Sequence, residues 1–475
     1  KMRPMSTSQT PSASGWWPQL DGYQKMVFLV ATLAWMFDCL DQQLFNLARS
    51  PAMKQLLAAG ADPKFYGGLA TSIFVIGWAT GGMIFGSLGD RLGRAKMLAI
   101  TVMLYSIATG LSALSTGFWD FAAYRFLTGL GVGGVFGLAV ALVADTLPGH
   151  IRPRALGVLQ SFSAVGNVMA AGIGVVIALA VTSPGYWKWL FVIGAAPALL
   201  TAVIQMRRHE PEKWVAARDK AAAEGRRAGS YRDLFGHPTW RKHALLGMLL
   251  SCAGVIGLWG IGVFSNDMVG DIIAGSLKAK GVAAAEIAQK KQFWTAINLG
   301  CFNVGAFLGM MAFTRVTEVL GRRKTFAIFL IGALISTVFV FQSLNSTTDI
   351  LWMSPIMGFF QLSVFAGFSI YLPELFPTSL RSTGTSFCYN VGRYLAATGP
   401  FTLGVLAAKL AKKAEASAVA EAGANAAAAV IDAVKATARI DAFRDAASWM
   451  CLVFLLGLVV LPFLPETKGQ PLPED

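Results

Sequence analysis

The sequence predicts an all-α membrane protein: twelve transmembrane helices in two six-helix bundles, related by a pseudo-two-fold axis along the membrane normal. Composition is the first observation, since 55% of the 475 residues are hydrophobic, only 14% are charged, and the mean hydropathy is +0.55. Soluble enzymes do not have this composition. The second observation is a series of apolar runs long enough to cross a bilayer, and the third is a charged motif pattern that both halves of the chain share.

The first half of the chain contains six apolar runs and ends in a polar stretch. The runs lie near residues 24–47, 65–88, 96–114, 119–143, 155–181 and 187–206. Each suits a helix that rises 1.5 Å per residue across a hydrocarbon layer about 30 Å thick. Basic residues outnumber acidic ones in 207–243, so this stretch is expected to be a cytoplasmic linker. Residues 1–23 then form a cytoplasmic N-terminal tail, and 24–206 form the N-terminal bundle.

The second half repeats this plan with one addition. Its apolar runs lie near residues 244–268, 292–313, 324–342, 350–372, 382–409 and 447–464. We therefore expect a C-terminal bundle at 244–464 and a cytoplasmic tail at 465–475. The basic loops place both termini in the cytoplasm, and we expect a multi-pass protein of a bacterial inner (cell) membrane.

The addition is an Ala-rich extracytoplasmic insertion at 410–446, too polar to cross a bilayer but rich in helix-forming residues. We expect an amphipathic helix, broken near Gly423, and a solvated spacer is the alternative. Its apolar face would carry Val430, Ile431, Val434 and Ala438, and the charged residues Asp432, Lys435, Arg439 and Asp441 would point elsewhere.

Two charged motifs recur after a shift of about half the chain. The segment that begins Asp90-Arg91 and ends Gly93-Arg94 has its counterpart in Glu318 followed by Gly321-Arg322, 228 residues later. A second motif pairs an acid with an arginine seven residues on, and it recurs after 229 residues: Asp145 with Arg152, then Glu374 with Arg381. Two independent motifs that agree on one shift indicate a parallel repeat of two bundles.

Two carboxylates lie deep in the first apolar run. Asp38 and Asp41 are three residues apart and share a helix face, roughly 20 to 24 Å into the hydrocarbon layer when counted from Lys25. Acids at this depth are costly and usually mark an ion, proton or substrate path. Two such acids cannot both ionise cheaply, so we expect at least one to load and release protons. Sodium coordination is the alternative, as is a purely structural buried pair.

At this point the motifs resemble those of a known family. Gly86-Ser87-Leu88-Gly89-Asp90 through Lys96, together with Arg125 to Gly129 and Pro465 to Gly469, is similar to the loop and helix signatures of major facilitator superfamily transporters. The paired aspartates and the segment Asn390 to Arg393 resemble the metabolite:proton symporters that carry aromatic acids, sialic acid and related carboxylates. The resemblance implies alternating access between two sides of the membrane.

The resemblance also implies a gate of ion pairs at the cytoplasmic helix ends. We expect four pairs within the halves, namely Asp90 with Arg94, Asp145 with Arg152, Glu318 with Arg322 and Glu374 with Arg381, with Arg91 beside the first. Exposed pairs of this kind contribute about 0 to 1 kcal/mol each, which as a network is enough to bias a two-state equilibrium. A role in membrane orientation alone is the alternative.

A permanent cation inside the eleventh run points to an anionic substrate. Arg393 lies twelve residues beyond Arg381, roughly 18 Å deep, and guanidinium suits a carboxylate bidentately. The expected substrate-binding residues are Arg393, Tyr389, Asn390, Arg125 near the outer mouth, and the intramembrane amides Asn298 and Gln361. The competing interpretation is that Arg393 only neutralises Asp38 or Asp41.

The sequence therefore predicts a proton-coupled symporter of a small organic anion, an aromatic or sugar carboxylate. The alternatives are a transporter of a neutral sugar or organic cation, and a non-transporting sensor or scaffold. We expect no enzyme activity, no catalytic residue, no metal and no cofactor, since neither nucleotide loops nor ligand spacings occur. The net charge of +14 lies in loops between spans, so we expect a lipid bilayer and protons as partners, not nucleic acid, and a monomer.

Overall fold

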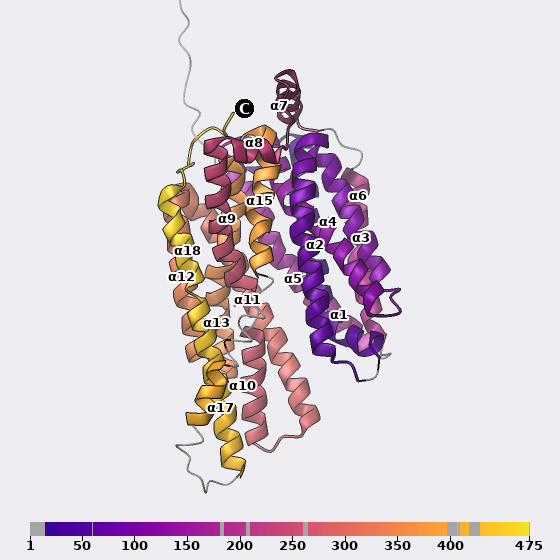
Figure 1. The fold of residues 1–475 in the computed structure, drawn as a ribbon, viewed down its shortest axis with the longest axis vertical. Helices are drawn as coiled ribbons and strands as arrows, with labels where there is room; N and C mark the ends of the chain where they lie inside the picture. Colours follow the sequence, from indigo (N-terminus) through magenta and orange to yellow (C-terminus); the bar gives the residue numbers. More distant parts are fainter. Residues whose placement is uncertain are drawn as a thin grey trace, which may run out of the picture.

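The described chain is helical throughout. The structure is a computed structural model that describes residues 15–58, 60–180, 185–205, 210–259, 265–396, 406, 409–417 and 428–474. Within these ranges there are α- and 3-10 helices but no strands, and 10 helices are long and apolar enough to cross a membrane. The predicted all-α membrane fold is confirmed, and its helices stand side by side as one upright bundle (Figure 1).

Six long helices form the N-terminal half. They are α1 (Gly22–Leu56), α2 (Pro63–Leu92), α3 (Arg94–Ser112), α4 (Phe118–Thr146), α5 (Arg152–Ala180) and α6 (Tyr186–Gln205). The first begins with a capping box, in which Asp21 accepts the backbone N–H of Gln24 and the Gln24 side chain accepts that of Asp21. Its interior is apolar apart from the predicted carboxylates, so α1 buries most of its length against α4, α5 and α6.

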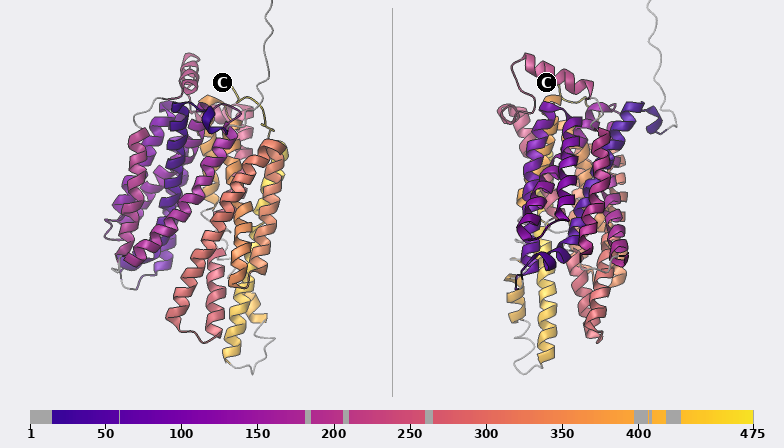
Figure 2. Two further views of the ribbon diagram at one scale, coloured as in Figure 1. Left: turned by 180° about the vertical axis from the view of Figure 1, so that it is seen from behind. Right: turned by 90° about the vertical axis from the view of Figure 1, so that its right-hand side faces the viewer.

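The second half has more, and more broken, helices. They are α9 (Pro238–Trp259), α10 (Ser265–Ala279), α11 (Ala284–Leu320), α12 (Arg322–Ser343), α13 (Thr347–Gln361), α14 (Ser363–Tyr371), α15 (Arg381–Ala396), α17 (Ala428–Met450) and α18 (Val453–Val460). Short 3-10 turns lie at Leu372–Leu375, Thr378–Leu380 and Leu461–Phe463. Figure 2 shows the two halves as separate groups of helices that meet at one end.

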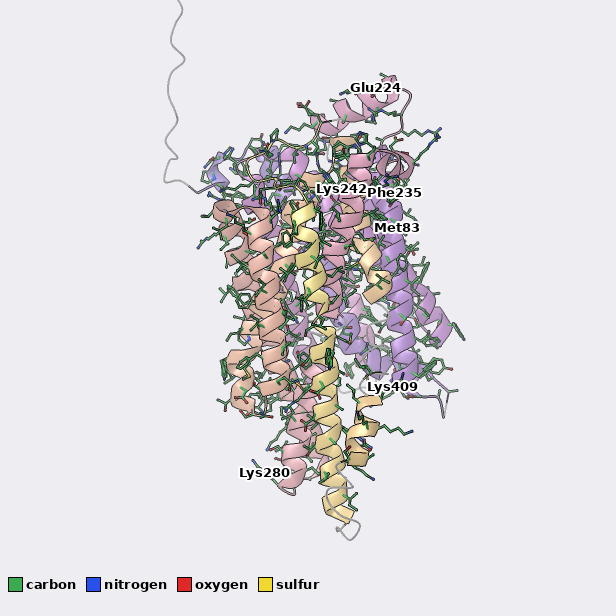
Figure 3. All side chains as sticks on the ribbon, turned by 60° about the vertical axis from the view of Figure 1, so that its left-hand side comes forward. Met83, Glu224, Phe235, Lys242, Lys280 and Lys409 are labelled. Atoms are coloured by element: carbon green, nitrogen blue, oxygen red, sulfur yellow. The ribbon has the colours of Figure 1, made fainter. Side chains whose placement is uncertain are left out.

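The two ends of the bundle are unlike. At the end that we call the linker end, α8 (Tyr231–Gly236) lies across the helix ends and α7 (Glu212–Ala223) projects above them, both near the C-terminus (Figure 1). At the opposite end, which we call the far end, α10, the start of α11 and α17 extend beyond the helices of the N-terminal half (Figures 1 and 2). Figure 3 shows Glu224 at the linker end and Lys280 and Lys409 toward the far end.

The far-end extension includes the Ala-rich segment, which is helical at residues 409–417 and again from Ala428, where α17 begins. The end of α17 joins α18 in one apolar span, Thr437–Phe463. Ala438 is buried while Arg439 is exposed, as the predicted faces require. Gly423 and the side chains of Val430 and Asp432 lie outside the described residues. Over the seventh apolar run, α9 ends at Trp259, and α10 begins at Ser265 and continues to Ala279.

The halves meet along two seams: α2 and α4 of the first half pack against α15 of the second, and α5 packs against α11 and α14. Small residues permit the first contact. A Cβ at Gly86 would lie 2.4 Å from Ser386 Cβ, and one at Gly82 would lie 2.1 Å from the Asn390 side chain. The other face of α2 packs just as closely on α4, where a Cβ at Gly81 would meet the Leu130 carbonyl at 1.9 Å.

Candidate functional site

The two aspartates of α1 are fully buried, as their place in the sequence predicted, but they have different neighbours. Asp38 accepts a hydrogen bond from Gln42 at 3.2 Å and interacts electrostatically with Asp41 and Arg393. Its other oxygen has no hydrogen-bond partner among the described residues. Asp41 points toward α4 and α6: its Oδ2 lies 4.0 Å from Arg125 Nη1, and its Oδ1 would lie 3.6 Å from a Cβ at Gly194.

Arg125 lies inside the first half, where α3, α4 and α6 surround it. Its Nε and Nη2 donate to Ser112 at 3.1 and 2.7 Å, and its guanidinium lies 4.7 Å from the Phe191 ring centre. The side chain is 0% exposed. The structure thus buries Arg125 beneath α1 and α6 with Asp41 as its carboxylate neighbour, and its place near the outer mouth stays a prediction. Both oxygens of Asp41 and Nη1 of Arg125 lack a hydrogen bond within the described part of the chain.

Arg393 lies between the halves. Its guanidinium is 4.0 Å from the Trp78 ring of α2 and 4.0 Å from the Tyr389 ring on its own helix. Nη1 donates to the Tyr389 carbonyl at 2.7 Å and to Asn390 Oδ1 at 3.2 Å. Among the described residues, no carboxylate lies within 4.0 Å of this guanidinium and its Nε has no hydrogen-bond partner. The Trp78 and Tyr389 rings thus lie against this guanidinium, and its Nε is left without a hydrogen bond.

The other predicted ligands divide into two groups. Tyr389 is buried against the first half, with its ring stacked 3.7 Å from that of Phe136, which in turn packs on Trp35 of α1. Tyr389, Asn390 and Arg393 are thus brought together with Asp38. Asn298 and Gln361 lie within the second half, where Asn298 accepts the Ser354 hydroxyl at 2.5 Å and Gln361 donates to Thr337 at 2.8 Å.

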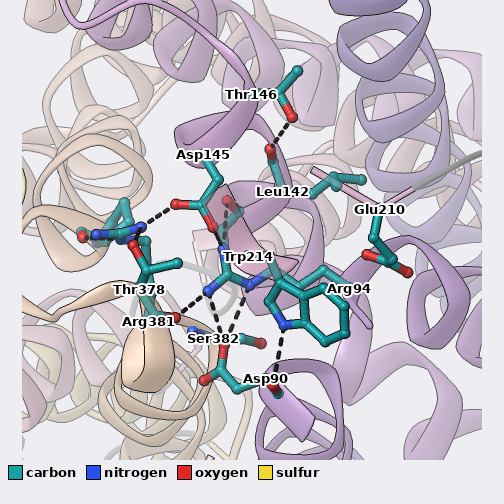
Figure 4. Close-up of polar contacts among 12 residues, drawn as sticks. Asp90, Arg94, Leu142, Asp145, Thr146, Glu210, Trp214, Thr378, Arg381 and Ser382 are labelled. Atoms are coloured by element: carbon teal, nitrogen blue, oxygen red, sulfur yellow. Dashed lines mark hydrogen bonds and ion pairs between the residues drawn. The ribbon is translucent and has the colours of Figure 1, made fainter. Parts of the chain in front are cut away.

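A buried charge network closes the linker end between the halves (Figure 4). Arg94 donates to Asp90 at 2.9 Å and is also ion-paired with Asp145 at the end of α4. Asp145 receives a second ion pair from Arg381 of the other half. Asp90 accepts the backbone N–H groups of Ser382 and Thr383, at 3.2 and 2.8 Å, from the start of α15. These side chains are almost fully buried.

The second half has a similar but less crowded cluster. Arg322 donates from Nε and Nη2 to Glu374 at 3.0 and 2.8 Å, as Arg94 binds Asp145 in the first half. The Thr467 hydroxyl also donates to Glu374. Glu318 accepts Arg154 of α5 at 2.7 Å, in a pair whose arginine is 54% exposed.

These contacts correct three of the four predicted ion pairs. Asp90 pairs with Arg94 as expected, but Asp145 binds Arg94 and Arg381, Glu374 binds Arg322, and Glu318 binds Arg154. For Asp145 and Glu374 the reason is that a spacing of seven residues crosses the loop between two helices, and the loop directs acid and base to different neighbours. Glu318 is bound by Arg154 of α5, and Arg322 binds Glu374 instead. The network is also buried rather than exposed. Arg91 lies at its edge and donates to the Gly229 carbonyl at 3.3 Å.

The linker takes part in this closure, which the sequence did not predict. Glu210 accepts the N–H groups of Ala95 and Lys96 at 3.0 and 2.9 Å, at the positive end of α3. Trp214 Nε1 donates to the Asp90 carbonyl at 3.0 Å, and the N–H of Gly229 donates to Ser379 of the second half at 2.8 Å. Glu466 of the second half accepts the Arg322 and Arg323 N–H groups in the same way, but it follows Pro465 whereas Glu210 precedes Pro211, so the sequence did not reveal the likeness.

Within the described residues, no group of three His, Cys, Asp or Glu side chains could hold a metal ion. Inside the bundle, Asp38, Asp41, Arg125 and Arg393 keep atoms without hydrogen bonds, whereas the acids and arginines of the linker end form close ion pairs. It can bind an anion at Arg393, hold a proton at Asp41 or Asp38, and change the contact between two halves.

Both the sequence and the fold are similar to those of known transporters. A sequence profile described as Major Facilitator Superfamily matches residues 31–285, and one described as Sugar (and other) transporter matches residues 223–474. The solved structure of the proton:xylose symporter XylE, bound to 6-bromo-6-deoxy-D-glucose, has a TM-score of 0.67 and 18% identity, and the match covers 95% of this chain and 98% of that one. At this identity the likeness concerns the fold.

Curated relatives are similar over most of their length. A putative metabolite transport protein of Haemophilus influenzae is 28% identical over 71% of this chain and 79% of its own length. The cis,cis-muconate transport protein of Acinetobacter baylyi is 27% identical over 81% and 87%, respectively. The sialic acid transporter NanX of Escherichia coli is 26% identical over 83% and 89%.

Proposed function

Because the chain belongs to the major facilitator superfamily, a family of transporters, we propose that it is a proton-coupled symporter of a small organic anion. The linker end is assigned to the cytoplasm, which places both termini there, and the membrane is a bacterial inner membrane. The two halves rock about the substrate to open one end or the other. One chain supplies every group this cycle needs, so the working unit is a monomer.

The observation that carries the proposal is Arg393. It is a permanent cation at the contact of the two halves, with no carboxylate within 4.0 Å among the described residues. A buried charge without a partner is costly, whereas a substrate carboxylate would pair with its free edge bidentately. The same argument disfavours the competing interpretation: Asp38 is close enough to act on Arg393, but it makes its hydrogen bond to Gln42.

The surroundings of Arg393 favour a planar acid. The Trp78 and Tyr389 ring centres each lie 4.0 Å from its guanidinium, and Phe136 extends the aromatic surface toward Trp35. Muconate and sialic acid, named for two of the relatives, are carboxylic acids. A flat carboxylate would keep its charge on the guanidinium edge and its carbon frame on these rings.

Asp41 and Arg125 supply the proton step. Protonation of Asp41 removes the charge opposite Arg125, which changes the balance of charge inside the first half without moving the substrate. Asp38 lies between this pair and Arg393, since it acts electrostatically on Asp41 and on Arg393. The symporter thus couples the binding of a proton at Asp41 to the binding of an anion at Arg393, and Asp38 is the carboxylate that links the two sites electrostatically.

Closure of the linker end makes this an outward-facing state. Asp90 and Asp145 of the first half hold the start of α15 from the second half, and opening to the cytoplasm requires these buried bonds to separate. Substrate and proton enter from the far end, and their binding offsets the cost of separation. Substrate and proton must together bind more tightly to the state open at the linker end, by a few kcal/mol, which is the usual free-energy gap between two such states.

Uptake into proteoliposomes tests the proposal. With a panel of aromatic and sugar acids, uptake should follow a pH gradient that is acidic outside, and it should persist without sodium. Arg393→Ala should abolish binding of the acid, and Arg393→Lys should recover only part of it because an ammonium cannot form the bidentate pair. Asp41→Asn should abolish accumulation while still permitting exchange of labelled substrate.

Three outcomes would contradict this function. Carboxylate binding that survives Arg393→Ala would return Arg393 to a neutralising role. Uptake that ignores pH but stops without sodium would replace the proton by sodium. Absence of flux for every solute in the panel, from protein that still binds one of them, would favour a sensor.

A neutral sugar is the second candidate, because the Sugar (and other) transporter profile matches residues 223–474. The amides Asn298 and Gln361, both in this range, are groups that hydrogen-bond hydroxyls. Uptake of a neutral sugar that tolerates Arg393→Ala but not Gln361→Ala would favour this candidate.

A further inference from the structure

Arg152 is a buried cation without a counter-charge at the linker end. It is the first residue of α5, it is 7% exposed, and its Nε has no hydrogen-bond partner. Across the described part of the chain, no carboxylate lies within 4.0 Å of its guanidinium. The gate network described above therefore leaves this arginine unused.

The internal repeat shows which ion pair Arg152 lacks. Arg152 is the counterpart of Arg381, and Arg381 crosses between the halves to pair with Asp145. The mirror-image contact would join Arg152 to Glu374. Glu374 is already occupied, because it accepts two hydrogen bonds from Arg322 and one from Thr467. Of the four residues in the second repeated motif, Asp145, Arg152, Glu374 and Arg381, Arg152 alone has no ion pair among the described residues.

The groups that face Arg152 are mostly cations. Arg381, Glu374 and Arg322 act on it electrostatically, and the single carboxylate among them is the one bound by Arg322. Lys213 of α7 faces the same region from the linker: burial lowers its pKa, and the charges of Arg152 and Arg381 lower it further. Guanidinium does not lose its proton in proteins, so this region keeps an excess of positive charge.

We propose that Arg152 and Lys213 bind a phosphate-type anion at the linker end when the two halves are closed there. A guanidinium fork and an ammonium group together match the several oxygens of such an anion. Free phosphate and the phosphate of a lipid headgroup share this chemistry, and both are present where a helix end meets the cytoplasm. Arg381 of the second half acts electrostatically on both Arg152 and Lys213, so an anion bound there also attracts the second half and stabilises closure. The site is independent of the transported solute.

Thermal unfolding of the purified full-length protein, in a detergent without phosphate, tests the site. Inorganic phosphate should raise the unfolding midpoint in a saturable manner, beyond chloride at the same ionic strength. Arg152→Gln should weaken the apparent affinity at least tenfold, and Lys213→Gln severalfold. Arg241→Gln, an exposed cation of α9 at the same end, should leave it unchanged. Because Lys213 is exposed, its variant retains the test if Arg152→Gln does not fold.

The source of the phosphate is distinguished in nanodiscs. Native mass spectrometry should show retained phosphatidylglycerol on the wild type and less on Arg152→Gln if a lipid headgroup fills the site. A response to free phosphate without lipid retention would assign the site to the soluble anion. Equal behaviour of wild type and Arg152→Gln in both experiments would overturn the proposal, as would a structure in which Arg152 pairs with Glu374 at low phosphate.

Discussion

The two faces of α2 make equally close contacts that must behave differently. On one face Gly81 meets the backbone of Leu130 in α4, inside the first half. On the other face Gly86 meets the side chain of Ser386 in α15, across the boundary between the halves. In the proposed cycle, the first contact persists because each half rocks as a rigid unit, while the second must break. Close packing of Gly81 against α4 therefore stabilises the fold, whereas close packing of Gly86 against α15 stabilises one conformational state.

Gly81→Ala should have the largest effect, because it breaks the contact within a half. The new Cβ would lie 1.9 Å from the Leu130 carbonyl oxygen and 2.6 Å from Leu130 Cα, and backbone cannot give way as a side chain can. We expect a loss of more than about 3 kcal/mol, at the upper end of overpacking costs, and little folded protein. Yield and thermal unfolding in detergent measure it. Gly68→Ala on the same helix is the control, since no atom lies within 4 Å of its Cβ.

Asp90→Asn should have the next largest effect, on the equilibrium between states. Asp90 is buried, faces Arg94 and accepts two N–H groups from α15, so its neutralisation costs about 3 to 5 kcal/mol in the closed linker end. We expect transport to slow at least tenfold with substrate binding retained. Spin labels at Lys96→Cys and Lys324→Cys, one in each half, should show a longer distance. Wild-type transport in this variant would contradict the gate.

Gly86→Ala should produce a smaller shift of the same kind. Its Cβ would meet Ser386 Cβ at 2.4 Å and Oγ at 2.5 Å, and separation of the halves relieves the overlap. We expect a shift of about 1 to 3 kcal/mol toward the state open at the linker end, with the unfolding midpoint nearly unchanged. The same spin labels report it. Adding Ser386→Gly removes the opposing Cβ and should restore the wild-type distance; if it does not, the overlap is not the cause.

Glu210→Gln should have the smallest effect, confined to one half. Glu210 accepts two N–H groups at the start of α3, and a neutral side chain loses the favourable charge at that helix end. We expect a loss of about 0.5 to 1 kcal/mol and a midpoint lowered by about 2 °C, without a change in spin-label distance. Glu212→Gln, exposed in the first turn of α7, should do neither. A longer spin-label distance would instead make Glu210 part of the gate.

Much of the candidate site was predictable because it depends on neighbours along the chain. Hydrophobic periodicity located the spans, and their length against a bilayer placed Asp38, Asp41 and Arg393 deep inside. The repeat of Asp90 to Arg94 in Glu318 to Arg322 indicated two similar halves before any packing was known. The capped start of α1 likewise follows from Asp21 and Gln24, three residues apart.

Partner choice was not predictable in this way. Asp145 binds Arg381, Asp41 lies opposite Arg125, and Arg393 lies on Trp78, each across a long separation in sequence. These partners depend on how helices rotate and how the halves meet, which a linear spacing does not encode. The charge clusters of the two halves show this dependence most clearly. Arg152 and Arg381 occupy equivalent positions in the repeat, but Arg381 pairs with Asp145, whereas Glu374 accepts the Thr467 hydroxyl and does not pair with Arg152.

The sequence by itself thus determined that the protein is an all-helical membrane protein with apolar spans and two repeated halves, because these follow from composition and from 1.5 Å of helix rise per residue. Only the tertiary structure decided which charges are paired, which end is closed, and that the Ala-rich segment extends the last span from Ala428. The physical reason is that a buried charge takes whichever partner the packing of whole helices brings within reach, and this packing is a property of both halves together.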